Sequence, residues 1–204
     1  MSFYKQVTSK PWEYQGPVTG SGPESAFETE SEKIALTLFL VVVSVIFSLL
    51  TVTYYLRMDL GDWVPLQDPV ILWMNTALLV ISSVAFQIAS NHAQLERMSS
   101  ARMYFIAGGA FAVLFVAGQS YVWMQLDSSG LGVANNPSSA FFYLLTGMHA
   151  VHLLGGLWVW SRTTFRLTGN ADISACRLSM ELCTTYWHFL LVLWVLLFAI
   201  LANT

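Results

Sequence analysis

Three histidines lie within apolar segments of this chain, and they are the side chains there whose type suits chemistry. His149 and His152 are three residues apart in one segment, and His188 lies in another. Three imidazoles can bind zinc and leave a fourth position open, whereas two histidines on one helix face cannot clamp a haem between two helices. No carboxylate or thiolate accompanies them at ligand spacing. We therefore expect structural histidines that hydrogen-bond to neighbouring helices, with a metal or haem site as the alternative.

Acidic and basic side chains are absent from the middle of these segments. Glu181 shares a helix face with His188, but it is about two turns away, too far for a direct bond. Buried Asp, Glu, Lys or Arg normally mark an ion path through a membrane. The sequence therefore does not favour a proton path within this chain alone. It also contains no phosphate-binding loop, nucleophile motif or basic nucleic-acid stripe, so we expect no nucleic-acid partner.

The composition places these residues in a membrane protein. Of the 204 residues, 55% are hydrophobic and 10% are charged, against about 25% charged in a soluble domain. We predict an all-α, polytopic membrane helix bundle with five transmembrane helices in residues 34–204, preceded by a polar, irregular cytoplasmic tail in residues 1–33. The expected spans are residues 34–56, 69–90, 103–126, 139–160 and 181–202.

Polar residues follow one face of two of these spans. They are Thr76, Ser83, Gln87 and Ser90 in the second span, and Thr146, His149, His152 and Gly156 in the fourth. Because polar groups are costly in lipid, both faces should meet protein. Hydroxyls, imidazoles and glycines on one face are typical of closely packed transmembrane helices.

The distribution of positive charge predicts the orientation. Five spans place the two termini on opposite sides of the membrane. With the N-terminus in the cytoplasm, eight of the nine Lys and Arg residues lie inside and only Arg57 lies outside. Cytoplasmic segments near spans are enriched in Lys and Arg. We therefore expect the N-terminus inside and the C-terminus outside.

Four segments, in order along the chain, resemble subunit III of the haem-copper terminal oxidases. They are PVILWMNTALLVISS at 69–83, GQSYVW at 118–123, SAFFYLLTGMHAVHLLGG at 139–156 and YWHFLLVLW at 186–194. The pairing of TGxHxxHxxGG with YWHFxxxxW is the specific part, and the resemblance covers nearly everything from Ile34 onward. It implies the short, five-helix bacterial form of a subunit whose long form has seven helices. The residues that carry the signature are Gln119, Thr146, His149, His152, Gly156, Trp187, His188, Phe189 and Trp194.

The resemblance implies a non-catalytic subunit of a proton-pumping oxidase of the cytochrome c oxidase type, in a bacterial cytoplasmic membrane. Such a subunit has no catalytic, cofactor-binding or metal-ligating residues of its own. It packs on subunit I, which holds the haems and copper, and it assembles with subunit II, other oxidase subunits and, further, a respiratory supercomplex. The family's lipid-filled cleft implies bound phospholipid from the surrounding membrane lipids. The subunit is expected to support proton uptake and stability during turnover.

Two positions depart from the family pattern. Many members have a buried glutamate in the helix matching residues 34–56, where Leu40–Phe47 is here apolar apart from Ser44. Many also have an aspartate two residues beyond the WHF motif, where this chain has Leu191. The roles of those acids are therefore not carried over. The alternatives are a quinol-oxidase subunit III, an accessory membrane protein of a nitric oxide reductase, and a free-standing haem or metal redox protein.

Overall fold

The computed structural model describes residues 23–60, 63, 71–130, 132–133, 136–168 and 173–203, and these ranges contain helices and no strand. All five helices are long and apolar enough to cross a membrane, which confirms the predicted all-α fold with five candidate spans. The helices are α2 (Pro23–Met58), α3 (Ile71–Gln94), α4 (Met98–Ser128), α5 (Pro137–Thr168) and α6 (Ile173–Ala202).

The helices extend beyond the apolar spans that the sequence predicts. Residues 23–33, expected as part of an irregular tail, are helical, while residues 1–22 lie outside the described residues. The expected basic loop of residues 161–180 is helical except at 169–172, which are not described. The predicted start of the second span, Pro69, also lies outside the described residues. Hydropathy marks the length that fits the hydrocarbon, whereas backbone hydrogen bonding continues into the polar layer.

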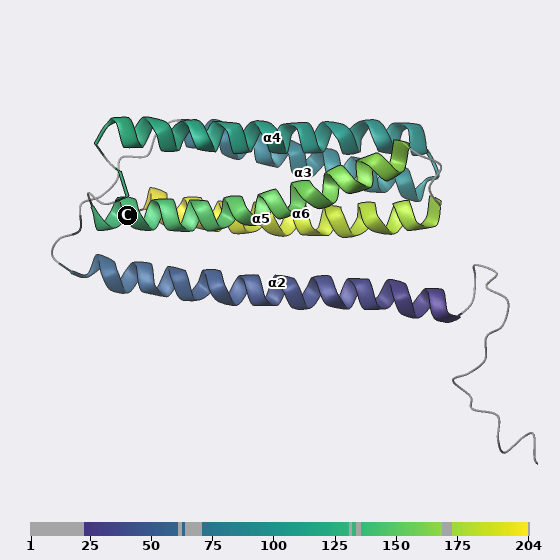
Figure 1. The fold of residues 1–204 in the computed structure, drawn as a ribbon, viewed down its shortest axis with the longest axis horizontal. Helices are drawn as coiled ribbons and strands as arrows, with labels where there is room; N and C mark the ends of the chain where they lie inside the picture. Colours follow the sequence, from purple (N-terminus) through teal and green to yellow (C-terminus); the bar gives the residue numbers. More distant parts are fainter. Residues whose placement is uncertain are drawn as a thin grey trace, which may run out of the picture. The chain divides into compact units, whose positions relative to one another are not determined.

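Local backbone chemistry fixes several of the helix ends. Proline stands first in α5, where its missing N–H has no intrahelical partner to lose. Beyond the end of α4, Gly130 has a φ of 78°, a left-handed conformation that glycine adopts without steric cost. The short turn between α3 and α4 has Glu96 at a φ of 59°. These turns reverse the chain so that consecutive helices run antiparallel (Figure 1).

Contacts divide the chain into two compact units, Met1–Ala35 and Leu36–Thr204. The second unit holds most of the first span and the whole of the other four. Within it, α3 packs against α4 and α6, and α5 packs against α4 and α6, so these four helices form a closed ring. Large aromatic side chains fill the ring. Those that are fully buried are Phe86, Phe105, Phe115, Phe142, Trp187 and Trp194.

Helix α2 has fewer buried residues than the other four. Only 11% of its most apolar window is buried, against 33–39% in the other spans. From Leu36 onward, aromatic rings join it to the ring of helices. Phe47 lies 5.6 Å from the ring of His152 on α5, and Tyr54 lies 5.7 Å from Phe141 on the same helix. From Leu36 to Met58, most side chains of α2 are therefore exposed.

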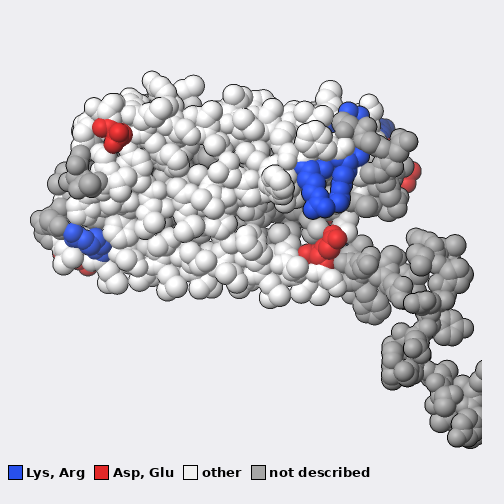
Figure 2. Space-filling model, viewed as in Figure 1, with Lys and Arg blue, Asp and Glu red and all other residues white. Residues whose placement is uncertain are grey.

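Basic side chains within residues 36–204 gather at one end of the helices (Figure 2). Figure 1 places the ends of α3 and α5 and the starts of α4 and α6 at that end. The described arginines on these segments are Arg97, Arg102, Arg162, Arg166 and Arg177. Arg57, in the last turn of α2, is at the opposite end. The unequal distribution of basic residues between the two ends is the basis for predicting that the N-terminus lies in the cytoplasm. The orientation in the membrane stays a prediction.

Candidate functional site

Tryptophan indoles and hydroxyl groups pair across the helix interfaces. Trp194 on α6 donates its Nε1–H to the hydroxyl oxygen of Thr76 on α3, at 2.9 Å. Trp123 on α4 donates to the hydroxyl oxygen of Thr146 on α5, at 3.1 Å, and Thr146 in turn donates to a carbonyl of its own helix. Each pair satisfies polar atoms that would otherwise be buried without partners. Thr76 on the polar face of α3 and Thr146 on that of α5 therefore meet protein, as their spacing predicts.

His188 joins α6 to α3 through both of its ring nitrogens. The hydroxyl of Ser83 lies in hydrogen-bonding contact with Nδ1, and the side-chain oxygen of Gln87 lies 2.8 Å from Nε2. If the Ser83 O–H donates to Nδ1, the Nε2–H donates to Gln87, which assigns the tautomer from the network. This histidine thus has the interhelical hydrogen bonds that the sequence predicts.

His149 differs from that expectation. Its side chain is fully buried, and neither ring nitrogen has a hydrogen-bond partner among the described residues. Its ring instead lies 5.2 Å from the ring of Trp194 and 6.2 Å from that of Phe115. The hydrogen-bonding role predicted for His149 is therefore wrong in this structure, because aromatic side chains from α4 and α6 fill the space around the imidazole.

His152 faces a third interface. Its Nδ1 lies 2.8 Å from the carbonyl of Met148 on its own helix, and its ring contacts Phe39 and Phe47 of α2. His149 points into the ring of helices, and His188 contacts α3. Within the described ranges no group of three His, Cys, Asp or Glu side chains is placed to hold a metal ion. The three histidines of the motifs thus lie at separate interfaces.

Gly156 brings α5 close to α6. A Cβ atom at this position would lie 2.8 Å from Cε1 of Tyr186, closer than side chains pack. The phenol of Tyr186 donates a hydrogen bond of 2.8 Å to the backbone carbonyl of His152, one turn earlier on α5. Beside it, Trp187 is buried and stacks on Phe86 at 5.1 Å, and Phe189 is partly buried against the core. The two motifs TGMHAVHLLGG and YWHF thus contact each other directly.

Gln119 is buried beside Asn75, a residue that the sequence reasoning did not single out. The Asn75 amide lies 3.5 Å from the side-chain oxygen of Gln119, while Gln119 Nε2 has no partner among the described residues. A Cβ on Gly118 would lie 2.3 Å from the Asn75 oxygen, so a larger residue there would displace the Asn75 amide. A lone amide in the otherwise apolar start of α3 is the signal that could have identified Asn75.

The close approach of α5 to α4 at Trp160 was also not predicted from the sequence. Trp160 on α5 donates a hydrogen bond of 2.9 Å to the carbonyl of Phe105 on α4. A Cβ on Gly109 would lie 1.9 Å from the Trp160 indole. The glycine pair in the sequence indicates a small-residue contact, but the sequence does not show that a tryptophan 51 positions later fills the gap.

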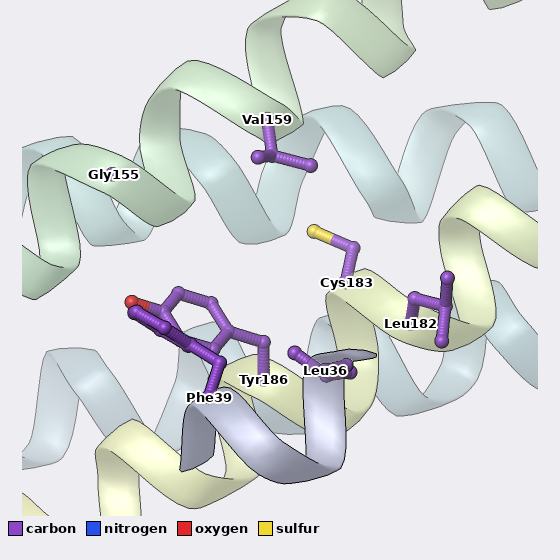
Figure 3. Close-up of a pocket in the computed structure, with 7 residues that line it drawn as sticks. All are labelled: Leu36, Phe39, Gly155, Val159, Leu182, Cys183 and Tyr186. Atoms are coloured by element: carbon purple, nitrogen blue, oxygen red, sulfur yellow. The ribbon is translucent and has the colours of Figure 1, made fainter. Parts of the chain in front are cut away.

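An apolar groove of about 350 Å³ separates parts of α2, α5 and α6 (Figure 3). In the figure, Phe39 and Leu36 of α2 face Tyr186 and Cys183 of α6, with α5 above them. The lining residues are Leu36, Phe39, Gly155, Val159, Leu182, Cys183 and Tyr186. Hydrocarbon and sulfur line almost all of this space, so it suits an apolar occupant rather than a polar substrate.

The chain matches a family model described as cytochrome c oxidase subunit III over residues 18–202. A protein named cytochrome c oxidase subunit 3 from Thermostichus vulcanus is 26% identical over 197 residues, which cover 92% of this chain and 96% of that protein. A protein of the same name from Synechocystis is 29% identical and covers 80% of this chain and 71% of its own length. A probable cytochrome c oxidase subunit 3 from Mycobacterium tuberculosis is 27% identical, with 69% and 71% covered.

Proposed function

The chain belongs to the cytochrome c oxidase subunit III family, and we propose that it is the non-catalytic subunit of a proton-pumping haem-copper oxygen reductase. Its homologues and its five candidate spans make it a multi-pass membrane protein and a subunit III. In this proposal it resides in a bacterial cytoplasmic membrane and packs on subunit I, beside subunit II. The relatives' names favour the cytochrome c oxidase type over a quinol oxidase or a nitric oxide reductase accessory protein.

The observation that carries the non-catalytic assignment is the placement of the imidazoles. A haem or a metal ion needs donors that converge on one point. His149 is enclosed by Trp194 and Phe115, His152 contacts α2 and its own helix, and His188 is engaged by α3. These residues therefore do not fit a haem or metal ion between them. In our proposal the haems and copper belong to partner subunits, and this chain supplies a rigid, hydrogen-bonded bundle.

Bound phospholipid is the second part of the proposal, and the apolar groove supports it. Gly155 and Val159 line the groove, and Arg162 and Arg166 continue the same face of α5 toward the basic end at seven and eleven residues beyond Gly155. Both arginines are exposed, and neither has an ion pair with another described residue. An acyl chain in the groove would place an anionic headgroup near these guanidinium groups. The ligand in this part of the proposal is therefore an anionic phospholipid.

The lipid site is tested by filling the groove. Val159→Trp should reduce the anionic phospholipid that copurifies with the complex, as measured by mass spectrometry of extracted lipid. Val113→Trp, on an exposed site of α4, is the matched control and should leave the lipid content unchanged. Equal lipid content in both variants would contradict the groove as the binding site.

The role in turnover is tested by removing the whole chain. The oxidase purified without it should still reduce oxygen at first, since the haems and copper are proposed to lie elsewhere. Its activity should then decay faster over many turnovers, and fewer protons should be taken up per electron. Oxygen consumption and proton uptake, compared with and without the chain, measure both effects. A complex with its full haem content and no initial activity would overturn the non-catalytic assignment.

A further inference from the structure

A hydrogen-bonded polar chain reaches the outer surface of the bundle near the middle of the membrane. Ser83 and His188 both lie at the midpoints of their helices, α3 and α6. Gln87 is one turn beyond Ser83, about 6 Å along the helix axis. Because the hydrocarbon extends about 15 Å on each side of the bilayer centre, all three residues lie well inside it. Gln87 is exposed there and His188 is only half-buried.

Partners within the described part of the chain do not use all the hydrogen-bonding groups of the Gln87 amide. Its oxygen lies 2.8 Å from His188 Nε2, and its nitrogen donates to the side-chain oxygen of Asn91 at 2.9 Å. A glutamine amide carries two N–H groups, and the second has no acceptor among the described residues. A donor left facing hydrocarbon is costly, so this surface should not face lipid.

Exposed polar side chains on α2 differ from Gln87 in their hydrogen bonding. Three exposed hydroxyl residues in the middle part of α2, Ser44, Ser48 and Thr53, each donate to the backbone carbonyl four residues earlier. A hydroxyl has one O–H donor, and the carbonyl four residues earlier in the same helix accepts it. The Gln87 amide has two N–H donors, and the second needs an acceptor from another molecule. The part of α2 around these three hydroxyls is therefore compatible with lipid, whereas the α3/α6 surface at Gln87 is not.

The side chains around Gln87 also suit a close helix contact. Ala77, Val80, Val84, Gln87 and Asn91 form one exposed stripe on α3, with spacings of three and four residues. Small and β-branched side chains allow a partner helix to approach closely. We call this stripe, with the adjoining His188, the α3/α6 seam.

We propose that the α3/α6 seam is the docking surface for a transmembrane helix of the haem-bearing subunit, and that this helix offers a hydrogen-bond acceptor to Gln87. The inference rests on the proposed function, because it takes its partner from the oxidase complex. It adds which face of the chain makes the contact and which side chain anchors it.

Site-specific photocrosslinking in intact membranes tests the seam. A photoreactive amino acid at Val84 should form an adduct with the haem-bearing subunit. The same probe at Val42, which is 56% exposed on α2 against 53% for Val84 and also lies near a helix midpoint, should form adducts with lipid. Adducts from Val84 that contain only lipid, or a second copy of this chain, would overturn the inference.

A steric variant provides a second measurement. Val84→Trp should lower the fraction of this chain retained with the haem-containing complex by about tenfold, as expected if it removes one hydrogen-bonded helix contact. Val42→Trp should leave retention unchanged. Unaltered retention in Val84→Trp overturns the docking inference alone. If the unmodified chain does not copurify with haem at all, the proposed function fails and this inference fails with it.

Discussion

Gly156→Ala should weaken the packing of α5 on α6. The added methyl group would lie 2.8 Å from Cε1 and 3.2 Å from Cδ1 of Tyr186, so the phenol ring must shift. The ring is held at its far end by the hydrogen bond from its hydroxyl to the His152 carbonyl. Moving it therefore strains or breaks that bond and separates the two helices at this level.

The expected loss combines two contributions. Overpacking a filled core typically costs about 1–3 kcal/mol. A hydrogen bond between transmembrane helices contributes about 0.6 kcal/mol on average and up to about 1.7 kcal/mol. Together they predict that Gly156→Ala lowers the free energy of unfolding by about 2–4 kcal/mol.

The neighbouring glycine provides the control. A Cβ at Gly155 would meet nothing within 4 Å. Gly155→Ala should be neutral or raise the free energy of unfolding by up to about 1 kcal/mol, because alanine loses less backbone entropy in a helix. The two variants lie one residue apart on the same helix, so their difference isolates the contact with Tyr186.

Unfolding of the purified chain in mixed micelles of increasing denaturing detergent, followed by far-ultraviolet circular dichroism, measures this difference. In a Tyr186→Phe background, which keeps the ring and removes the hydroxyl, Gly156→Ala should cost less by roughly the contribution of the hydrogen bond. If Gly156→Ala and Gly155→Ala unfold at the same detergent concentration, the close approach of the two helices is not as described.

Three further predictions concern the histidines, the orientation and the cofactor content. His149→Leu should leave the free energy of unfolding unchanged or raise it, since it removes two buried nitrogens without partners, whereas His188→Leu should lower it by about 0.6–2 kcal/mol. The same unfolding assay compares them, and a larger loss from His149→Leu would refute this account. A cysteine at Ser128, in a variant without native cysteines, should react with an impermeant reagent added outside intact cells, and one at Leu95 only after permeabilisation; labelling from one side contradicts the five-span topology. The chain purified alone should show no haem absorption and no stoichiometric copper or zinc, and a haem band lost in His149→Ala would disprove this.

The number and type of the helices could be predicted from the sequence because hydrocarbon imposes a length and a composition on each span. The residues at which the helices begin and end could not be predicted from the sequence. Residues 23–33 and most of 161–180 are polar or charged, and hydropathy does not distinguish a helix in the polar layer from a loop. The TGMHAVHLLGG motif was also predictable as a helix contact, since it places polar and small residues on one face, but its partner YWHF was not.

The sequence by itself determined that this is an all-α membrane protein with five spans and with polar faces that must meet protein, because these features depend on local composition and period. Its membership of the subunit III family comes from the order of its motifs and from the match to the family model. Only the tertiary structure decided the partner of each polar group. His149 and His188 have the same chemistry, yet one is enclosed by aromatic rings and the other bonds to Ser83 and Gln87. That difference comes from the neighbouring residues on α3, α4 and α6, most of them distant in the sequence, because a hydrogen bond forms only between atoms that packing brings within about 3 Å.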